Sequence, residues 1–246
     1  MILDRNAQAS HVINGQSLHF EQLFAAVRKL GIVKKQKLVH VKFGLVLGSD
    51  LKKLSTRAGK HIALDAVIAE AIERAKAVVA AKRPDLPARE REKIGRAVAI
   101  AALKYNDLSQ NRQSDIAFDW DTMLSFEGNS APYLMYTYAR LKSILRKGTP
   151  GRFDASALTG AADLNLVLSL AQLSDAVERV ASDYFPSHLA DYLYQLASQA
   201  NAFYHAEPVL KAEPALRSAR LHLVAAVAQT LKTGLALLGI PVLERM

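Results

Sequence analysis

From Leu64 onward, hydrophobic residues recur every three or four positions, which is the spacing of one face of an α-helix. The first such helix, 64–82, ends before Arg83-Pro84, because a proline disfavours helical geometry in the residue before it. Pro87 fits the first turn of the next helix. A long connection with local turns is predicted at 109–130. Four more helices are then predicted at 131–147, 163–182, 187–204 and 214–238.

The first sixty residues have a different pattern. Runs rich in β-branched residues at 11–14 and 38–48 predict strands, the second either a strand or a hairpin. Helical spacing at 19–31, closed by Gly31, predicts a helix between them. A strand–helix–strand piece of this size is a fragment of an α/β sheet. The predicted fold class is therefore mainly α, with a helical bundle preceded by a small α/β segment.

The net charge of the chain indicates what kind of partner it could bind. The 246 residues carry a formal net charge of +9, which favours a polyanion such as nucleic acid or an anionic membrane surface. The segment from Arg28 to Lys60 contains ten Lys or Arg residues and one acid, Asp50, so it is a candidate phosphate-binding face. The alternatives are a basic protein without such a partner and a face that is merely solvated.

Several classes are excluded or disfavoured. The chain has no cysteine, so disulfides and cysteine-based catalytic or metal sites are excluded, and a cytoplasmic location is consistent with this. The seven histidines show no metal-binding spacing, and we expect no metal site. The N-terminal residues are charged where a signal peptide needs an apolar run. The apolar stretch 221–243 contains His222, Gln229 and Lys232, so no membrane partner is expected.

The segment PYLMYTYARLK (132–142) places three tyrosines beside cations. At 100° per residue, one face of the 131–147 helix carries Leu134, Tyr138, Leu141 and Leu145, and another carries Tyr133, Tyr136, Arg140 and Lys147. Neighbouring rings next to cations suit unpaired bases and their phosphates, with stacking worth roughly 1–3 kcal/mol per base. The alternative is that these tyrosines pack against a neighbouring helix with their hydroxyls at its edge.

Acidic residues cluster in the connection before this helix. Asp115, Asp119, Asp121 and Glu127 are interpreted as caps of turns or helices in preference to acid–base catalysts. Trp120, in the same segment, is interpreted as an anchor at a domain junction in preference to a ligand platform.

Three stretches resemble one family. Residues 104–145 resemble the start of the anticodon-binding region of bacterial arginyl-tRNA synthetases, which are class I aminoacyl-tRNA synthetases. Residues 14–31 with 38–48 look like the last part of that family's catalytic domain. Residues 201–210 and 236–246 look like its C-terminus. The resemblance runs from about residue 11 onward and keeps the order of the family.

The resemblance implies a tRNA partner and a site. Residues from about 120 onward are expected to form the helical anticodon-binding domain. The family's anticodon-loop contacts correspond to Tyr133 and Tyr136 in the PYLMY element, to Tyr204 in the later FY element and to Met246. Arg140 and Lys147 join this predicted tRNA-binding set on the helical-face argument given above.

The resemblance also implies a catalytic motif that is altered. The family's KMSKS loop corresponds to Lys52, Lys53, Leu54, Ser55 and Thr56, and its second lysine falls at Ser55. No HIGH motif is present. ATP and magnesium are implied for the full-length family, but no cofactor is expected for this chain alone. We expect that the chain alone does not activate arginine.

The predicted division has three parts: a remnant of a Rossmann-like catalytic domain at 1–60, a helical connecting region at 61–119 and the anticodon-binding domain at 120–246. The predicted function is that of the tRNA-binding C-terminal portion of an arginine–tRNA ligase, which recognises arginine tRNAs. One alternative is a stand-alone RNA-binding or protein-interaction module without ligase activity. Another is one half of a split ligase, whose partner chain carries the missing catalytic half.

Overall fold

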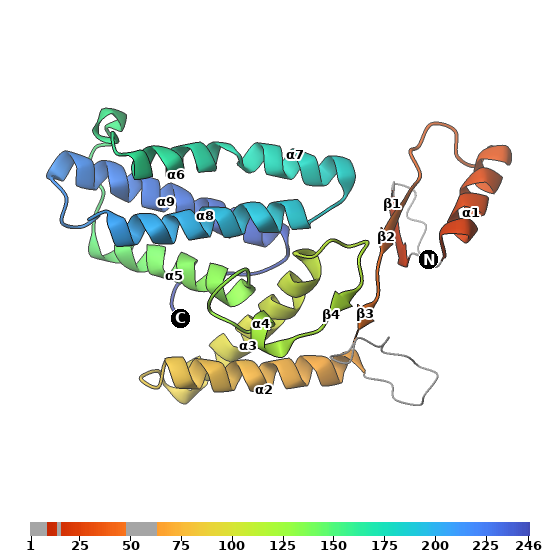
Figure 1. Ribbon diagram of the computed structural model, residues 1–246, viewed down its shortest axis with the longest axis horizontal. Helices are drawn as coiled ribbons and strands as arrows, with labels where there is room; N and C mark the ends of the chain where they lie inside the picture. Colours follow the sequence, from red (N-terminus) through yellow and green to blue (C-terminus); the bar gives the residue numbers. More distant parts are fainter. Residues whose placement is uncertain (1–8, 14–15, 48–62) are drawn as a thin grey trace. The chain divides into compact units, whose positions relative to one another are not determined.

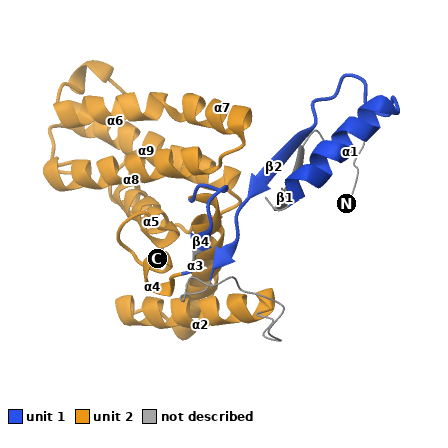
Figure 2. Cartoon of the chain, turned by 45° about the vertical axis from the view of Figure 1, so that its right-hand side comes forward, with its two compact units in different colours: residues 1–61, 110–118 blue, residues 62–109, 119–246 orange. Residues whose placement is uncertain are grey.

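The computed structural model describes residues 9–13, 16–47 and 63–246, and the chain forms two compact units (Figure 2). The first, called the sheet unit, contains residues 1–61 and 110–118. The second, called the helical unit, contains residues 62–109 and 119–246. The predicted division into three parts at 1–60, 61–119 and 120–246 stays a prediction.

The sheet unit contains a strand–helix–strand element. Strand β1 (Ala9–Ile13) pairs in parallel with β2 (Val39–Phe43), and helix α1 (Ser17–Lys29) connects them. The ring of Phe20 on α1 stacks on His40 at a centroid distance of 4.9 Å, and Phe20 and Val41 are buried. The predicted α/β fragment is therefore confirmed.

A second pair of short strands decides between the two forms predicted for 38–48, a strand or a hairpin. The described residues 38–47 contain two strands that do not pair with each other, because β3 (Val46–Leu47) pairs in parallel with β4 (Ile116–Ala117) from the distant connection. Gly44 lies between β2 and β3, where its amide donates to the carbonyl of Arg112 at 2.6 Å. A Cβ atom at Gly44 would lie 2.2 Å from the carbonyl oxygen of Ser114, so only glycine permits this approach.

The helical unit contains the remaining helices (Figure 1). They are α2 (Leu64–Lys82), α3 (Ala88–Leu108), α4 (Trp120–Met123), α5 (Ala131–Lys147), α6 (Ala161–Ala171), α7 (Leu173–Asp183), α8 (Ser187–Ala206) and α9 (Pro214–Leu237), with a 3₁₀ turn at Ala155–Ala157. Helices α2 and α3 pack as an antiparallel pair, and α9 packs against α5, α6 and α8. The fold class predicted from the sequence is confirmed.

Local chemistry explains where α5 begins. Ser130 is the N-cap, and its hydroxyl oxygen accepts a hydrogen bond from the amide of Tyr133 at 3.3 Å. Pro132 occupies the first turn, where its missing N–H leaves no unpaired donor. Arg146 and Lys147 lie in the last turn, where positive charge is favourable beside the free carbonyls. The observed bounds agree with the predicted helix 131–147.

The core of the helical unit is built mainly from leucines of facing helices. Fully buried members include Leu134 on α5, Leu193 on α8 and Leu231 on α9. The hydroxyl of Tyr105 on α3 is also buried, and its oxygen lies 2.6 Å from Asn129 Oδ1 and 3.1 Å from the carbonyl oxygen of Ala190, either of which can accept its single proton. A buried hydroxyl with both partners in place costs little to desolvate, so it fixes α3 against α8.

Two sequence predictions about helices need correction. The single helix predicted at 163–182 is two helices, α6 and α7, separated at Gln172. The amide of Gln172 donates to the carbonyl of Ser169, three residues back, so the α-helical ladder is interrupted there. The predicted connection at 109–130 also contains β4 and α4. In the described part of the chain, no helix is long and apolar enough to cross a membrane.

Candidate nucleic-acid interface

Helix α5 presents two chemically different faces, as its sequence predicts. Leu134, Tyr138 and Leu141 are buried and face the core of the helical unit. Tyr136 lies on the other face with 39% of its surface exposed, and Tyr133 is half-buried. One ring is therefore accessible to solvent and the other is partly accessible. Tyr133 also packs toward α8, with its ring 5.8 Å from that of Tyr194 and its hydroxyl bonded to Asn201, as the alternative for these tyrosines expects, so the tRNA-binding role of the two tyrosines stays a prediction.

Arg140 lies between two tyrosine rings. Its guanidinium carbon is 4.9 Å from the ring centroid of Tyr136, one turn earlier on α5, and 5.5 Å from that of Tyr204 on α8. Tyr204 is 42% exposed. A guanidinium over an aromatic face is attracted by the ring quadrupole, and this contact holds its charge at the surface. Two predicted rings and a predicted cation thus form one aromatic–cation cluster from two helices.

Asn201 on α8 connects this cluster to Tyr133. Its Oδ1 accepts from Arg140 Nη1 at 2.8 Å, and its Nδ2 donates to the hydroxyl of Tyr133 at 3.0 Å and to Thr137 Oγ1 at 2.8 Å. A guanidinium only donates, so the amide oxygen must face Arg140 and the amide nitrogen must face the hydroxyls. This network sets the position of both Tyr133 and Arg140.

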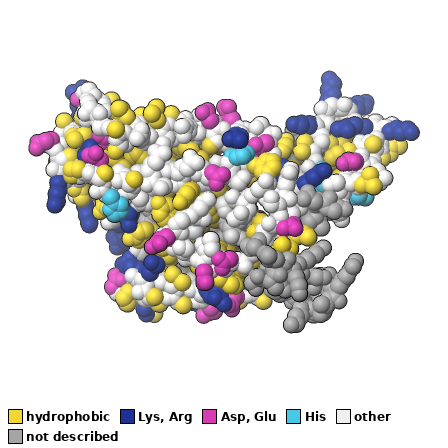
Figure 3. All heavy atoms as spheres, in the orientation of Figure 1, with side chains coloured by type: hydrophobic (Ala, Val, Ile, Leu, Met, Phe, Trp, Pro, Cys, Tyr) yellow, Lys and Arg dark blue, Asp and Glu magenta, His cyan; other side chains and the backbone are white. Residues whose placement is uncertain are grey.

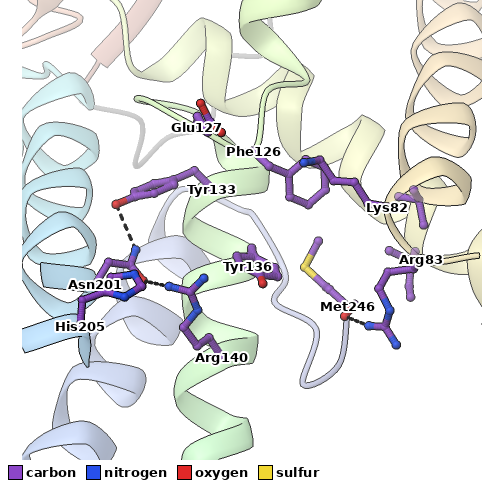
Figure 4. Close-up of a pocket in the computed structure, with 12 residues that line it drawn as sticks. Lys82, Arg83, Phe126, Glu127, Tyr133, Tyr136, Arg140, Asn201, His205 and Met246 are labelled. Carbon is purple, nitrogen blue, oxygen red and sulfur yellow. Dashed lines mark hydrogen bonds between the residues drawn. The ribbon is translucent and has the colours of Figure 1, made fainter. Parts of the chain in front are cut away.

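Tyr133, Tyr136, Arg140 and Asn201 line a pocket of about 470 Å³ in the helical unit (Figure 4). Residues from α5 and α8 form one side, and residues from the α2 C-terminus form the other. Met246 also lines it, and the main-chain oxygen of Met246 accepts a hydrogen bond from Arg83. The full lining is Val79, Lys82, Arg83, Ile94, Phe126, Glu127, Tyr133, Tyr136, Arg140, Asn201, His205 and Met246.

Phe126 and Lys82 extend the aromatic and cationic character of the pocket. The Lys82 ammonium lies 5.2 Å from the centroid of the Phe126 ring. The Phe126 ring meets that of Tyr136 edge to face at a centroid distance of 6.2 Å. Sequence reasoning did not select these residues, nor Arg83, Asn201 or His205. Asn201 and His205 flank the recognised FY element, so their position in the sequence was the one available signal.

Two predicted groups of residues lie elsewhere. Lys147 is exposed and does not line the pocket, because it is eleven residues beyond Tyr136 on α5, or about 16 Å along the helix. The loop of Lys52, Lys53, Leu54, Ser55 and Thr56 lies outside the described residues. Tyr204 lies within the aromatic–cation cluster although it does not line the pocket itself.

Acidic residues of the connection serve as caps and ties. Asp119 is the N-cap of α4 and accepts from the amides of Asp121 and Thr122. These bonds, with one from the Thr122 hydroxyl, lower the pKa of the Asp119 carboxyl below its ordinary value, the hydroxyl contributing most. Asp115 accepts from the amide of Leu45 at 2.8 Å. Among the described residues, no group of His, Cys, Asp or Glu could hold a metal ion.

The basic segment from Arg28 to Lys60 can be placed in part. Five of its cations, Arg28, Lys29, Lys34, Lys35 and Lys37, are exposed on and after α1 in the sheet unit. In Figure 3, several dark blue basic side chains gather at the edge of this part, whereas both basic and acidic side chains are visible over the helical unit. The pocket lining itself contains the cations Lys82, Arg83 and Arg140 and the acid Glu127. The strongest run of positive charge along the sequence belongs to the sheet unit.

Comparison with known families defines the class of the helical unit. Residues 134–246 match the DALR anticodon binding domain, so the helical unit contains a domain of the anticodon-binding class. Residues 4–120 match the catalytic domain of class I tRNA synthetases of the arginine type. The two matches follow each other along the chain in the order that the sequence resemblance implied.

Individual relatives agree. The chain is 52% identical to an arginine–tRNA ligase of Laribacter hongkongensis and 47% identical to one of Chromobacterium violaceum, in each case over 94% of this chain and 41% of the relative. The arginyl-tRNA synthetase of Thermus thermophilus superposes with a TM-score of 0.88 at 36% identity, covering 97% of this chain and 41% of the other. That of Plasmodium falciparum gives 0.81 at 28% identity, covering 99% of this chain and 42% of the other.

The chain belongs to the arginyl-tRNA synthetase family, and it corresponds to the end of the catalytic domain followed by the DALR anticodon-binding domain. It spans about two fifths of the length of the relatives it matches, which is the 41% coverage given above. The resemblance noted in the sequence is thereby confirmed.

Proposed function

We propose that the helical unit binds the anticodon loop of arginine tRNAs through the pocket on α5 and α8. The observation that carries this proposal is the cluster of Tyr136, Arg140 and Tyr204, in which two exposed rings flank a guanidinium beside an open pocket. Unpaired bases stack on exposed aromatic rings, and a guanidinium adds charge attraction and a planar surface. The DALR match and the names of the relatives support the same partner.

Each predicted residue has a role in this proposal. Tyr136 and Tyr204 offer stacking surfaces, and Arg140 between them faces the phosphates or a base edge. Tyr133, held by Asn201, forms the wall of the pocket, and Met246 contributes an apolar edge on the opposite side. Lys147 would meet a phosphate outside the pocket, since it is exposed at the far end of α5. We place this activity in the cytoplasm, in agreement with the tRNA partner.

A tRNA-binding measurement tests the proposal. The Kd of full-length arginine tRNA, measured by anisotropy at fixed salt, should rise about 5- to 150-fold for Tyr136→Ala, because one stacked base is worth roughly 1–3 kcal/mol. Phe153→Ala is the matched control, since Phe153 is an exposed ring that does not line the pocket. Equal binding by wild type and Tyr136→Ala would contradict the assigned face. Equal binding of a tRNA with a changed anticodon would contradict the specificity.

We also infer that arginine activation requires the part of the family's catalytic domain to which no residues of this chain correspond. The family uses ATP with magnesium, but the chain has no HIGH motif, and in the correspondence that the resemblance implies Ser55 stands where the KMSKS loop has its second lysine. Loss of one preorganised donor at a charge-stabilising site typically lowers the rate about 10²–10³-fold. An ATP–pyrophosphate exchange assay with arginine and tRNA should therefore show background rates for this chain, and turnover would overturn the inference.

The sheet unit favours a second candidate function, as one half of a split ligase. Its β1–β2 pair is parallel and two-stranded in the described residues, and parallel sheets are normally larger and covered on both faces. Leu18, Leu30 and Ile32 are exposed beside it, which is consistent with a surface that another part of a catalytic domain covers. Adding a polypeptide that carries the HIGH-containing part should then restore pyrophosphate exchange. Failure of the two to associate would exclude this candidate.

A module that has lost RNA binding is the remaining alternative. It predicts no detectable tRNA complex at any salt concentration, because without phosphate contacts there are no counterions to release. The same anisotropy titration therefore separates it from the tRNA-binding proposal.

A further inference from the structure

A second groove adjoins the pocket within the helical unit. It has a volume of about 450 Å³ and lies between the exposed side of α2 and the α4 segment. Lys82, Phe126 and Glu127 line both the groove and the pocket, so the two share a border. A ligand longer than one nucleotide that occupies the pocket can therefore continue into the groove without leaving the surface of this unit.

The groove repeats the chemistry of the pocket. In the pocket, Arg140 contacts the rings of Tyr136 and Tyr204. At the shared border, Lys82 lies over Phe126, and in the groove the guanidinium carbon of Arg74 lies 5.2 Å from the centroid of the Trp120 ring. Pairs of a flat ring and a cation thus recur across both cavities. This is the composition of surfaces that bind single-stranded nucleic acid, where rings stack with bases and cations follow the backbone.

The spacing of the cations fits more than one nucleotide. Arg74 and Lys82 are eight residues apart on α2, which corresponds to about 12 Å along the helix. Successive stacked bases of a strand are separated by about 3.4 Å. The two cations therefore lie far enough apart to contact different phosphates of one strand, with the half-buried ring of Trp120 beside the cation farther from the pocket.

Acidic side chains in and beside the groove restrict which kind of base the groove could bind. Arg74 forms an exposed ion pair with Glu70 at 2.6 Å, and such pairs are weak enough to exchange for a phosphate. Asp121 and Glu127 also line the groove. A carboxylate repels a phosphate but accepts hydrogen bonds from the amino group of cytosine. The groove is thus suited to a base with an exocyclic amine whose phosphate lies over α2.

We propose that this groove is a second RNA-binding site, which takes an unpaired nucleotide next to those in the pocket. Trp120 provides the stacking surface, and Arg74 and Lys82 contact the backbone phosphates. The proposal rests on the proposed function, because it needs the same RNA in the pocket. It also gives Trp120 a role as a ligand platform, which its sequence context did not favour.

The protein contains its own reporter for this site, since Trp120 is the only tryptophan in the chain. Two measurements are made with an anticodon stem-loop RNA of an arginine tRNA. Anisotropy of labelled RNA reports binding anywhere on the protein, and tryptophan emission with unlabelled RNA reports stacking on Trp120. We expect that saturating RNA quenches the emission and reduces the access of acrylamide to the indole.

Variants separate stacking from indirect effects. Trp120→Leu keeps an apolar side chain in place but removes the flat ring, and it should raise the Kd about fivefold or more. Lys82→Gln should lower the slope of log Kd against log salt by about one, because one phosphate contact is lost. Lys232→Gln is the charge control, since Lys232 is exposed on α9 and lines neither cavity, and it should leave the slope unchanged.

The outcomes distinguish the two proposals. If RNA binds but the emission is unchanged, or if Trp120→Leu binds as wild type does, the second site is wrong and the anticodon pocket remains. If no RNA binds in the anisotropy assay, the proposed function fails and the second site fails with it. Because the emission measurement uses the wild-type chain, the test stands even if the Trp120→Leu variant does not fold.

Discussion

Asn201 links the two helices of the pocket, because its side chain on α8 is hydrogen-bonded to three side chains of α5. Its single amide holds the guanidinium of Arg140 and the hydroxyl of Tyr133, and it also donates to Thr137. The side chains of Tyr133 and Arg140 on α5 are therefore positioned from α8, and neither is oriented by its own helix alone. Pre-organising long side chains in this way reduces the entropy that binding would otherwise cost.

The substitution Asn201→Leu tests this role. It removes three hydrogen bonds, each worth about 0.5–1.5 kcal/mol net, from a half-buried position that water can partly reach. We expect about 1–2 kcal/mol lower stability in urea unfolding and about tenfold weaker tRNA binding. Gln195→Leu, on an exposed position of α8, is the control and should change neither. Tight tRNA binding by Asn201→Leu would show that the pocket does not depend on this network.

A second single residue, Asp119, allows a prediction about how the stability of the fold depends on pH. Hydrogen bonds from the Thr122 hydroxyl and from two amides lower the pKa of this carboxyl in the folded state. A lowered folded pKa contributes stability above the ordinary aspartate pKa, and that contribution is lost as pH falls through the folded value. Asp119→Asn still caps but does not titrate. The stability difference between wild type and this variant, followed by Trp120 fluorescence, should therefore shrink from pH 5 downward, and a constant difference would contradict the assignment.

Among the elements, a buried ion pair joins three helices of the bundle. Arg220 on α9 donates from Nε to Asp163 Oδ1 at 2.9 Å and from Nη2 to Asp163 Oδ2 at 3.1 Å, and Asp163 lies in the first turn of α6. Nη2 also donates to Glu207, which caps the C-terminus of α8, at 2.6 Å. Arg220 and Asp163 are almost fully buried. Such a pair favours one arrangement of the three helices, because either charge would be strongly destabilising if it were buried without its partner.

The substitution Arg220→Met should reduce the free energy of unfolding by about 3–5 kcal/mol, since it leaves Asp163 charged and buried without a partner. The double variant Arg220→Met/Asp163→Leu should regain much of that loss, because an apolar pair replaces the isolated charge. Arg217→Met, on an exposed position of the same helix, is the control. Urea unfolding measures all three. A double variant no more stable than Arg220→Met would show that the charges themselves were not the cause.

Local sequence signals determine the bounds of some helices and strands of this chain but not of others. The bounds and faces of α5 follow from Ser130, Pro132 and a regular apolar spacing, all of which are local signals. The break at Gln172 has no proline or glycine to mark it, so periodicity alone continued the helix. Strand β3 is too short for a pattern, and its partner β4 is about seventy residues away. Tertiary pairing, which local propensity does not encode, decides such elements.

The same limit applies to the candidate site. Tyr136 and Arg140 were predictable because they share a face of one helix. Lys82, Phe126 and Asn201 come from three other segments, and their approach to α5 depends on the packing of the whole helical unit. The sequence therefore indicated the rings on which bases could stack, while the cavity and the adjoining groove required the fold.

At the scale of the whole molecule, charge and rings should make separable contributions to tRNA binding. The net charge is +9, and exposed lysines at 34, 35 and 37 lie in the most basic part of the chain. Each phosphate contact releases counterions and steepens the dependence of log Kd on log salt by about 0.7–0.9. Stacking on Tyr136 releases few ions, so it should change affinity without changing this dependence.

A salt titration of three proteins makes this a prediction. Tyr136→Ala should give a line parallel to that of wild type, displaced to weaker binding at every salt concentration. The triple change of Lys34, Lys35 and Lys37 to glutamine should give a shallower line, with a slope reduced by roughly two to three if all three lysines contact phosphates. The lines of wild type and of the triple variant should lie farthest apart at low salt, where phosphate contacts contribute most. A triple variant with the wild-type slope would mean that this basic surface only keeps the protein soluble, and that the tRNA is held by the helical unit alone.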